Sequence, residues 1–104
     1  MKWFSNDSAR QAETRSLCRV LCRCRELVAC SADSDWSCVD VAGILNSLDS
    51  CLVQLSDGSS LNVNELKLLF LPTGPLQETS IDNGWGDEFL ELASEFDELI
   101  AKRC

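Results

Sequence analysis

Residues 71–90 read LPTGPLQETSIDNGWGDEFL, and this stretch decides how the C-terminal half of the chain folds. Pro72 disfavours helical geometry in the residue before it, so we expect a helix to end at that point. The pair Gly74–Pro75 indicates a tight turn, followed by a short irregular or single-turn segment over residues 76–81. The glycines that flank Trp85 permit unusual backbone angles where the next helix begins. The stretch therefore predicts a structured Pro/Gly loop between two helices.

The helix after this loop is predicted from about residue 83 to residue 102. Its apolar residues recur at steps of three and four, which is typical of a helix with one buried face. They are Trp85, Phe89, Leu92, Ala93, Phe96, Leu99 and Ile100. The opposite face is acidic and consists of Asp87, Glu88, Glu91, Glu95 and Glu98. Trp85 lies in register with the apolar face, which favours a core tryptophan over an exposed aromatic anchor at an interface.

The helix before the loop has the clearest start signal. Asn62 and Glu65 form a variant of the capping box, in which each side chain satisfies a backbone amide at the start of the helix. Leu61 and Leu66 occupy the positions of a hydrophobic staple. The side chains expected to face the core are Leu66, Leu69 and Phe70.

Two further helices are predicted in the first half of the chain, over about residues 8–30 and 36–55. Each has an apolar stripe at helical spacing. The first stripe consists of Leu17, Val20, Leu21, Cys24, Leu27 and Val28. The second consists of Val41, Ala42, Leu45, Leu48, Leu52 and Leu55. Ser34 or Asp35 is expected to cap the second helix, and Gly58 is expected to end it.

The polar face of the first helix is basic. It contains Arg15, Arg19 and Arg23 together with Glu26. A face of this kind is usually exposed to solvent, but it could also bind carboxylates. The sequence favours the solvent-exposed interpretation and leaves the second one open.

These predictions give an all-α fold, a small bundle of about four helices in which a structured Pro/Gly loop precedes the last helix. At 104 residues the chain fits one helical domain, residues 1–104. Residues 1–7 are interpreted as an N-terminal tail. Trp3 and Phe4 in this tail either fray or cover the core, and the sequence does not decide between the two.

The net charge of −8 is unevenly distributed. Residues 1–30 carry six basic and three acidic side chains, whereas residues 31–101 carry one basic and fourteen acidic side chains. A surface this acidic repels a phosphate backbone, so we expect no nucleic-acid partner. It attracts a basic protein, whose association the electric field accelerates. Simple solubility explains any single charge equally well.

No catalytic constellation is recognisable in the sequence. The chain has no histidine, which excludes triads and metal sites that depend on histidine. The residues around Gly74 lack the lysine of a phosphate-binding loop. The carboxylates of the last helix lie on a polar face, whereas acid–base catalysis needs them in a cleft. We therefore predict that the protein is not an enzyme and that it needs no cofactor and no metal.

Seven cysteines are present, and four of them, Cys18, Cys22, Cys24 and Cys30, fall in the first predicted helix. None belongs to a Cys-x-x-Cys pair, the usual spacing of zinc ligands. We interpret them as small buried or half-buried thiols, although Cys18 and Cys22, one turn apart, could share a metal.

The expected location is the cytoplasm. No apolar run approaches the roughly 18 residues that span a bilayer, so no membrane contact is expected. Residues 1–7 do not resemble the start of a signal peptide. An odd number of cysteines agrees with a compartment that keeps thiols reduced.

Residues 66–97 resemble the C-terminal part of a family of small bacterial proteins of uncharacterised function. The resemblance lies in LFLPTGPLQE at residues 69–78, NGWGDE at residues 83–88, LELA at residues 90–93 and FD at residues 96–97. It covers roughly the last third of the chain. Such short proteins look like immunity proteins of bacterial toxin systems, which are small, often acidic, and bind one cognate toxin. The resemblance therefore implies a protein partner that carries a basic toxin domain.

One principal hypothesis and two alternatives follow. In the principal hypothesis an immunity-type protein neutralises a toxin through its acidic surface, with Asp87, Glu88, Glu91, Glu95 and Glu98 as contacts. The first alternative is a self-associating structural or adaptor subunit, in which the basic face of the first helix meets the acidic face of the last helix of another copy. The second is a metal or redox module that uses Cys18, Cys22 and Cys24. The sequence leaves the oligomeric state open.

Overall fold

The computed structural model describes residues 2–33, 39–57, 61–72 and 74–103, and within these ranges it describes side chains from residue 11 to residue 102. The helices in the described ranges are α1 (Lys2–Ala29), α2 (Val41–Asp57), α3 (Val63–Leu69), α4 (Pro75–Asp82) and α5 (Gly86–Arg103). These ranges contain no strand, and the predicted all-α class is confirmed. The predicted number of about four helices is too low, because α4 is an additional helix.

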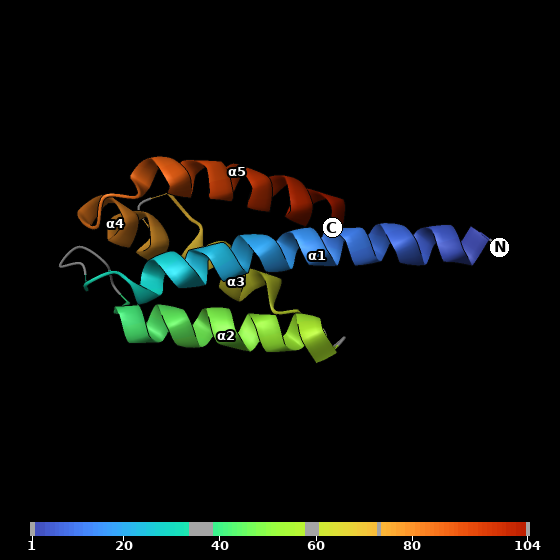
Figure 1. Ribbon diagram of the computed structural model, residues 1–104, viewed down its shortest axis with the longest axis horizontal. Helices are drawn as coiled ribbons and strands as arrows, with labels where there is room; N and C mark the ends of the chain where they lie inside the picture. The colour runs from blue at the N-terminus through green and yellow to red at the C-terminus, as the bar shows by residue number, and fades with distance from the viewer. Residues whose placement is uncertain (1, 34–38, 58–60, 73, 104) are drawn as a thin grey trace.

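The long helix α1 lies between α2 and α5, and the three helices run side by side (Figure 1). The short helix α3 contacts α2 and α4, while α4 also contacts α5. The N-terminal part of α1 extends beyond the other helices, and the molecule measures 52 × 23 × 21 Å. None of the helices in the described ranges is long and apolar enough to cross a membrane.

Helices α1 and α2 do not begin at the residues that the sequence predicted. α1 begins at Lys2, since no glycine or proline interrupts the N-terminal residues, and the predicted tail is therefore helical from that residue on. α2 begins at Val41, several residues after the predicted start. The Asp40 carboxylate accepts a hydrogen bond from the amide of Gly43 at 2.8 Å, and this cap fixes the start of α2. The predicted caps that lie outside the described residues are Ser34, Asp35 and Gly58.

Helix α4 replaces the irregular segment expected after the Pro/Gly turn. Pro75 occupies the first helical position, where its fixed φ favours a helix and its missing amide hydrogen costs nothing. Gly74 precedes it in an extended conformation, and a side chain there would meet the carbonyl oxygens of Leu71 and Leu68 at 2.8 and 3.1 Å. The prediction treated Pro75 as a turn residue and therefore missed this helix.

The core lies on both sides of α1. The apolar stripe of α1 is buried as predicted at Leu17, Val20, Leu21, Cys24 and Val28. The buried residues of α2 are Ile44, Leu48, Cys51 and Leu55. The stripe predicted for α2 was partly wrong, since Ala42 is exposed and Leu45 and Leu52 are only half-buried. Apolar residues surround much of α2, and its packing against both α1 and α3 selects the face that is buried.

The predictions for α3 and α5 are confirmed in part. Helix α5 begins at Gly86 rather than at about residue 83, and Leu92 and Ala93 of its predicted stripe are only half-buried. The Asn62 side chain accepts a hydrogen bond from the amide of Glu65 at 3.1 Å, which caps α3. The reciprocal bond of the capping box does not form, because the Asn62 amide donates to Oε1 of Gln54 at 2.9 Å. The predicted inward residues of α3 are buried, namely Leu66, Leu69 and Phe70. The buried residues of α5 are Phe89, Phe96, Leu99 and Ile100.

The Gly-Trp-Gly motif holds the turn between α4 and α5 against the end of α1. Trp85 is buried, and its indole nitrogen donates a hydrogen bond to the Ser31 hydroxyl at 2.9 Å. The amide of Ala32 donates to the side chain of Asn83, which donates back to the Ala32 carbonyl, both at 2.9 Å. Gly84 has a φ of +82°, a left-handed conformation that suits glycine. Trp85 is therefore the core residue that its register predicted.

Candidate functional site

Helix α5 has three sides with different surroundings, and together they form the candidate site. One side packs on α1 and carries Glu88 and Glu95. A second side faces solvent and carries Asp87, Glu91 and Glu98. The third side lines a groove whose other wall comes from α3, α4 and the loop between them.

The first side of α5 is joined to α1 by two ion pairs. Arg23 donates from Nε to Oε2 of Glu88 at 2.5 Å and from Nη2 to Oε1 at 3.0 Å. This bidentate geometry fixes the direction of the carboxylate. Arg19 pairs with Glu95 at 3.6 Å. All four side chains are partly exposed, so each pair adds little to stability, but both hold carboxylates of α5 against α1.

The Arg23 pair also sets the charge state of Glu88. The hydrogen bonds from Arg23 lower the pKa of Glu88, and they raise the pKa of Arg23. Glu88 is therefore ionised and already neutralised within the chain. The basic face of α1 thus binds carboxylates of its own α5, which is the interpretation that the sequence had left open. The contact that the self-association hypothesis places between two copies is made here within one chain.

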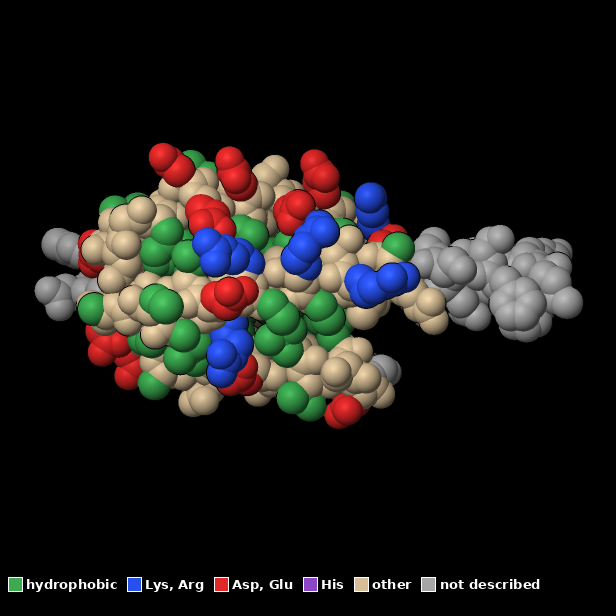
Figure 2. Space-filling view, in the orientation of Figure 1, with side chains coloured by type: hydrophobic (Ala, Val, Ile, Leu, Met, Phe, Trp, Pro, Cys, Tyr) green, Lys and Arg blue, Asp and Glu red, His purple; other side chains and the backbone are tan. Residues whose placement is uncertain are grey.

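The second side of α5 carries Asp87, Glu91 and Glu98, which we call the acidic ridge. Spacings of four and seven residues place them in one stripe, about 16 Å long. All three are exposed, and none forms an ion pair with another side chain that the structure describes. Figure 2 shows acidic side chains along the outer edge of α5 and others that meet basic side chains of α1. Of the five predicted contact residues, these three carry the unpaired charge.

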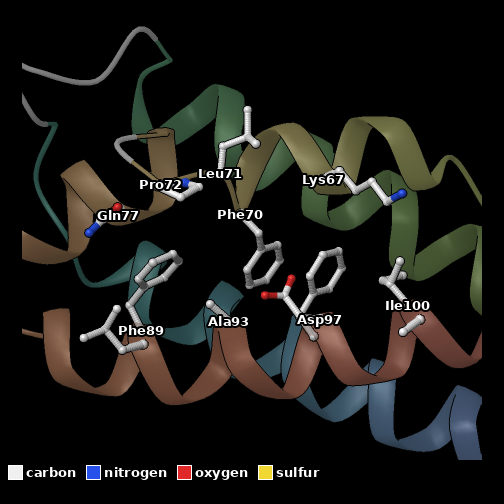
Figure 3. A pocket seen from close by; sticks show the side chains of 12 residues that line it. Lys67, Phe70, Leu71, Pro72, Gln77, Phe89, Ala93, Asp97 and Ile100 are labelled. Carbon is white, nitrogen blue, oxygen red and sulfur yellow. The ribbon is translucent and has the colours of Figure 1, made fainter.

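The third side of α5 lines an open groove with a volume of about 560 Å³. We call it the aromatic groove, because Phe70, Phe89 and Phe96 form its floor. Figure 3 shows α5 as one wall, with Asp97 on it, and α3 with Lys67 as the opposite wall. Its lining is mostly apolar, as in sites that bind ligands or partner side chains.

The floor of the aromatic groove is buried and tightly packed, whereas its rim is exposed. The Phe70 ring stacks on Phe96 with centroids 4.1 Å apart, and it lies 6.1 Å from the Phe89 ring. Leu71 and Leu90 at the rim are about half exposed. The sequence predicted the phenylalanines as core but not the groove above them. The sequence did contain one sign of the groove. Leu71 and Leu90 are large apolar residues that lie outside both predicted apolar stripes, so they were not expected to be buried in the core.

The described cysteines of α1 differ in their exposure to solvent. Cys24 is buried, and burial raises the pKa of its thiol to about 12. Cys18 and Cys22 lie one turn apart, and burial raises the pKa of the Cys18 thiol, with a smaller contribution from the nearby charge of Cys22. Cys22 is exposed whereas Cys24 is buried, so these two thiols lie on different sides of α1. Among the described residues, no three Cys, Asp or Glu side chains are arranged to hold a metal ion.

Comparisons of the chain with protein-family models, with curated proteins and with solved structures find no match. The resemblance of residues 66–97 to small bacterial proteins, and the immunity function that it implies, therefore stay predictions.

Proposed function

We propose that this chain is an immunity-type protein, which binds a basic domain of one cognate bacterial toxin and neutralises it. The acidic ridge of α5 is the proposed contact surface. One observation carries the proposal: Asp87, Glu91 and Glu98 stand exposed in one line without an ion pair to a described side chain, while Glu88 and Glu95 beside them are paired to α1. The ridge is therefore the part of the predicted acidic surface whose charge remains for a partner.

The arrangement of α5 suits recognition of a basic surface. A row of like charges on a helix destabilises it slightly, and a partner with the opposite charges relieves that repulsion. Complementary charges also accelerate association and select between partners. Buried side chains on one side and ion pairs to α1 hold α5 in place, so the ridge carboxylates are positioned before binding. As part of this proposal, the protein acts in the bacterial cytoplasm without catalytic activity or a cofactor.

The test compares two variants with the same change in net charge. The ridge variant is Glu91→Lys with Glu98→Lys, and the control is Glu13→Lys with Asp57→Lys, which alters carboxylates away from α5. Each tagged protein is used to capture partners from a lysate of the native organism at moderate salt, and mass spectrometry quantifies them. Affinity for the purified partner is then measured by calorimetry.

We expect the wild-type chain and the control to capture one stoichiometric partner with a basic domain, and the ridge variant to lose it. Charge reversal at two contact positions replaces attraction by repulsion, so we expect a loss of affinity of at least about 100-fold. Equal capture by both variants would contradict the assignment of the ridge. Recovery of the chain only with copies of itself would favour the self-associating subunit instead.

A further inference from the structure

The aromatic groove runs along α5 rather than into the molecule. Its α5 wall extends from Phe89 to Ala101, a distance of about 18 Å, or three helical turns. An elongated groove between helices matches the way an amphipathic helix is bound, with apolar side chains at spacings of three, four and seven residues inserted into it. The groove is open along its length, whereas a small-molecule site usually encloses most of its ligand.

The rim of the groove exposes apolar surface that water solvates poorly. Leu90 is 58% exposed on the α5 side, and Leu71 is 47% exposed on the opposite side. Large apolar side chains gathered around a groove are typical of an interface, because burying them against a partner releases water.

The charges around the groove differ between its two walls. The α5 wall carries Asp97, and the acidic ridge lies just beyond it on the same helix. The α3 wall carries Lys67 (Figure 3). A helix in the groove would therefore be most stable with basic residues along its edge nearest α5.

We propose that the aromatic groove binds one amphipathic helix of the toxin domain, with large apolar side chains on its inner face and lysine or arginine along the edge nearest α5. This inference rests on the proposed function, because the groove and the acidic ridge are adjacent sides of α5. The apolar side chains of the partner helix pack on Phe70, Phe89 and Phe96, and its basic edge reaches Asp97 and the ridge. The groove supplies contact area, and the ridge supplies orientation and rapid association.

A designed peptide tests the groove without the toxin. The probe is a fluorescent 14-residue helix with leucines spaced four and seven residues apart on one face and lysines along one edge. A second peptide has glutamate in place of every lysine. Binding to the full chain is followed by fluorescence anisotropy up to about 1 mM, the concentration at which very weak association is still detected.

Two protein variants form a matched pair. Leu90→Asn removes an apolar side chain from the groove rim, and Val53→Asn removes one of equal exposure from α2, since these residues are 58% and 57% exposed. Both positions are exposed and helical, so both variants should fold, which circular dichroism checks. Asp97→Asn tests the charge of the α5 wall.

We expect the lysine peptide to bind the wild-type chain and Val53→Asn equally and Leu90→Asn about tenfold more weakly. Asp97→Asn should reduce affinity for the lysine peptide, and the glutamate peptide should bind at least tenfold more weakly than the lysine peptide. Absence of saturable binding, equal effects of Leu90→Asn and Val53→Asn, or equal binding of both peptides would overturn the proposal. Binding of a neutral apolar dye is measured as well. If the dye saturates the groove and the peptide does not displace it, the groove is a small-molecule site and the proposal is wrong.

Partner capture separates the failure of this inference from that of the proposed function. If Leu90→Asn retains the toxin at wild-type affinity and the ridge variant loses it, the acidic ridge is the contact and the groove is not. If the ridge variant retains the toxin while the peptide binds the groove, the groove assignment stands and the role of the ridge is wrong.

Discussion

The side of α5 that packs on α1 and the side that forms the acidic ridge are made from the same residue types on the same helix. Glu88 and Glu95 meet Arg23 and Arg19, and their charge is neutralised within the chain. The ridge, Asp87, Glu91 and Glu98, is turned away from α1 and meets no cation among the described side chains. The position of each carboxylate around the helix axis thus decides whether it pairs with α1 or remains exposed and unpaired among the described side chains.

This difference shows why a count of charges overstates a binding surface. The sequence identifies five acidic residues on one polar face of α5, and nothing in their spacing separates the paired from the unpaired. The paired carboxylates differ from the unpaired ones only because Arg19 and Arg23 of α1 lie beside one edge of that face. The predictions below test whether the two sides of α5 really differ in this way.

The largest expected effect concerns the buried part of α5. Phe96 is 1% exposed and stacks on Phe70, so Phe96→Ala leaves a cavity and should lower the free energy of unfolding by about 3–5 kcal/mol. Leu90→Ala, on the exposed rim of the groove, should change it by less than about 0.5 kcal/mol. Urea denaturation followed by circular dichroism measures both. Similar losses for the two variants would mean that the groove is closed in solution.

A smaller loss of stability is expected when the charges of the Arg23–Glu88 pair are changed. Arg23→Glu places two carboxylates together and should lower the unfolding midpoint, by much less than Phe96→Ala because both groups are at the surface. The double variant Arg23→Glu with Glu88→Arg should recover most of that loss. As a control, Arg23→Glu combined with Glu98→Arg restores the same net charge without the contact. Equal recovery in both double variants would show that net charge, rather than the pair, is responsible.

The pH dependence of stability gives a finer test of the same pair. Since the hydrogen bonds from Arg23 hold the pKa of Glu88 below its ordinary value of 4.5, the folded chain keeps this carboxylate ionised to lower pH than the unfolded chain does. Its contribution to stability is therefore complete above pH 4.5 and is lost as the pH falls through the lowered pKa. Urea unfolding between pH 7 and pH 3 should show the difference between wild type and Glu88→Gln shrinking with acidity. Glu98→Gln controls for net charge, and a Glu88→Gln difference that stays constant over this range would argue against the pair.

Local signals in the sequence predicted the fold of the C-terminal half well. The Asn62 cap and most of the apolar stripe of α5 depend on neighbours within a few residues, and these parts of the prediction are confirmed. Helix α4 was missed because Pro75 can either end a turn or begin a helix, and the local sequence suits both. The stripe of α2 was misplaced because apolar residues lie on several of its sides.

The candidate site was less predictable, since it depends on contacts between distant parts of the chain. Arg23 and Glu88 are 65 residues apart, and their pairing follows from how α1 and α5 pack. The aromatic groove lies between α3 and α5, which form its opposite walls over a floor of Phe70, Phe89 and Phe96. Helical periodicity identifies the residues that are buried. It does not show whether two neighbouring helices pack tightly together or leave a groove between them.

The smallest predicted effect lies on the ridge itself. Asp87 and Glu91 are one turn apart and repel each other, so Glu91→Gln should stabilise the chain by about 0.2–0.5 kcal/mol at low salt. Molar salt screens the repulsion and should remove the gain. The matched control is Glu88→Gln, which should instead lose stability, because it removes a carboxylate that Arg23 binds. Chemical denaturation of both variants at two salt concentrations measures the opposite signs. If both variants lost stability, Glu91 would have a cationic neighbour, and the acidic ridge would no longer be a line of unpaired charges.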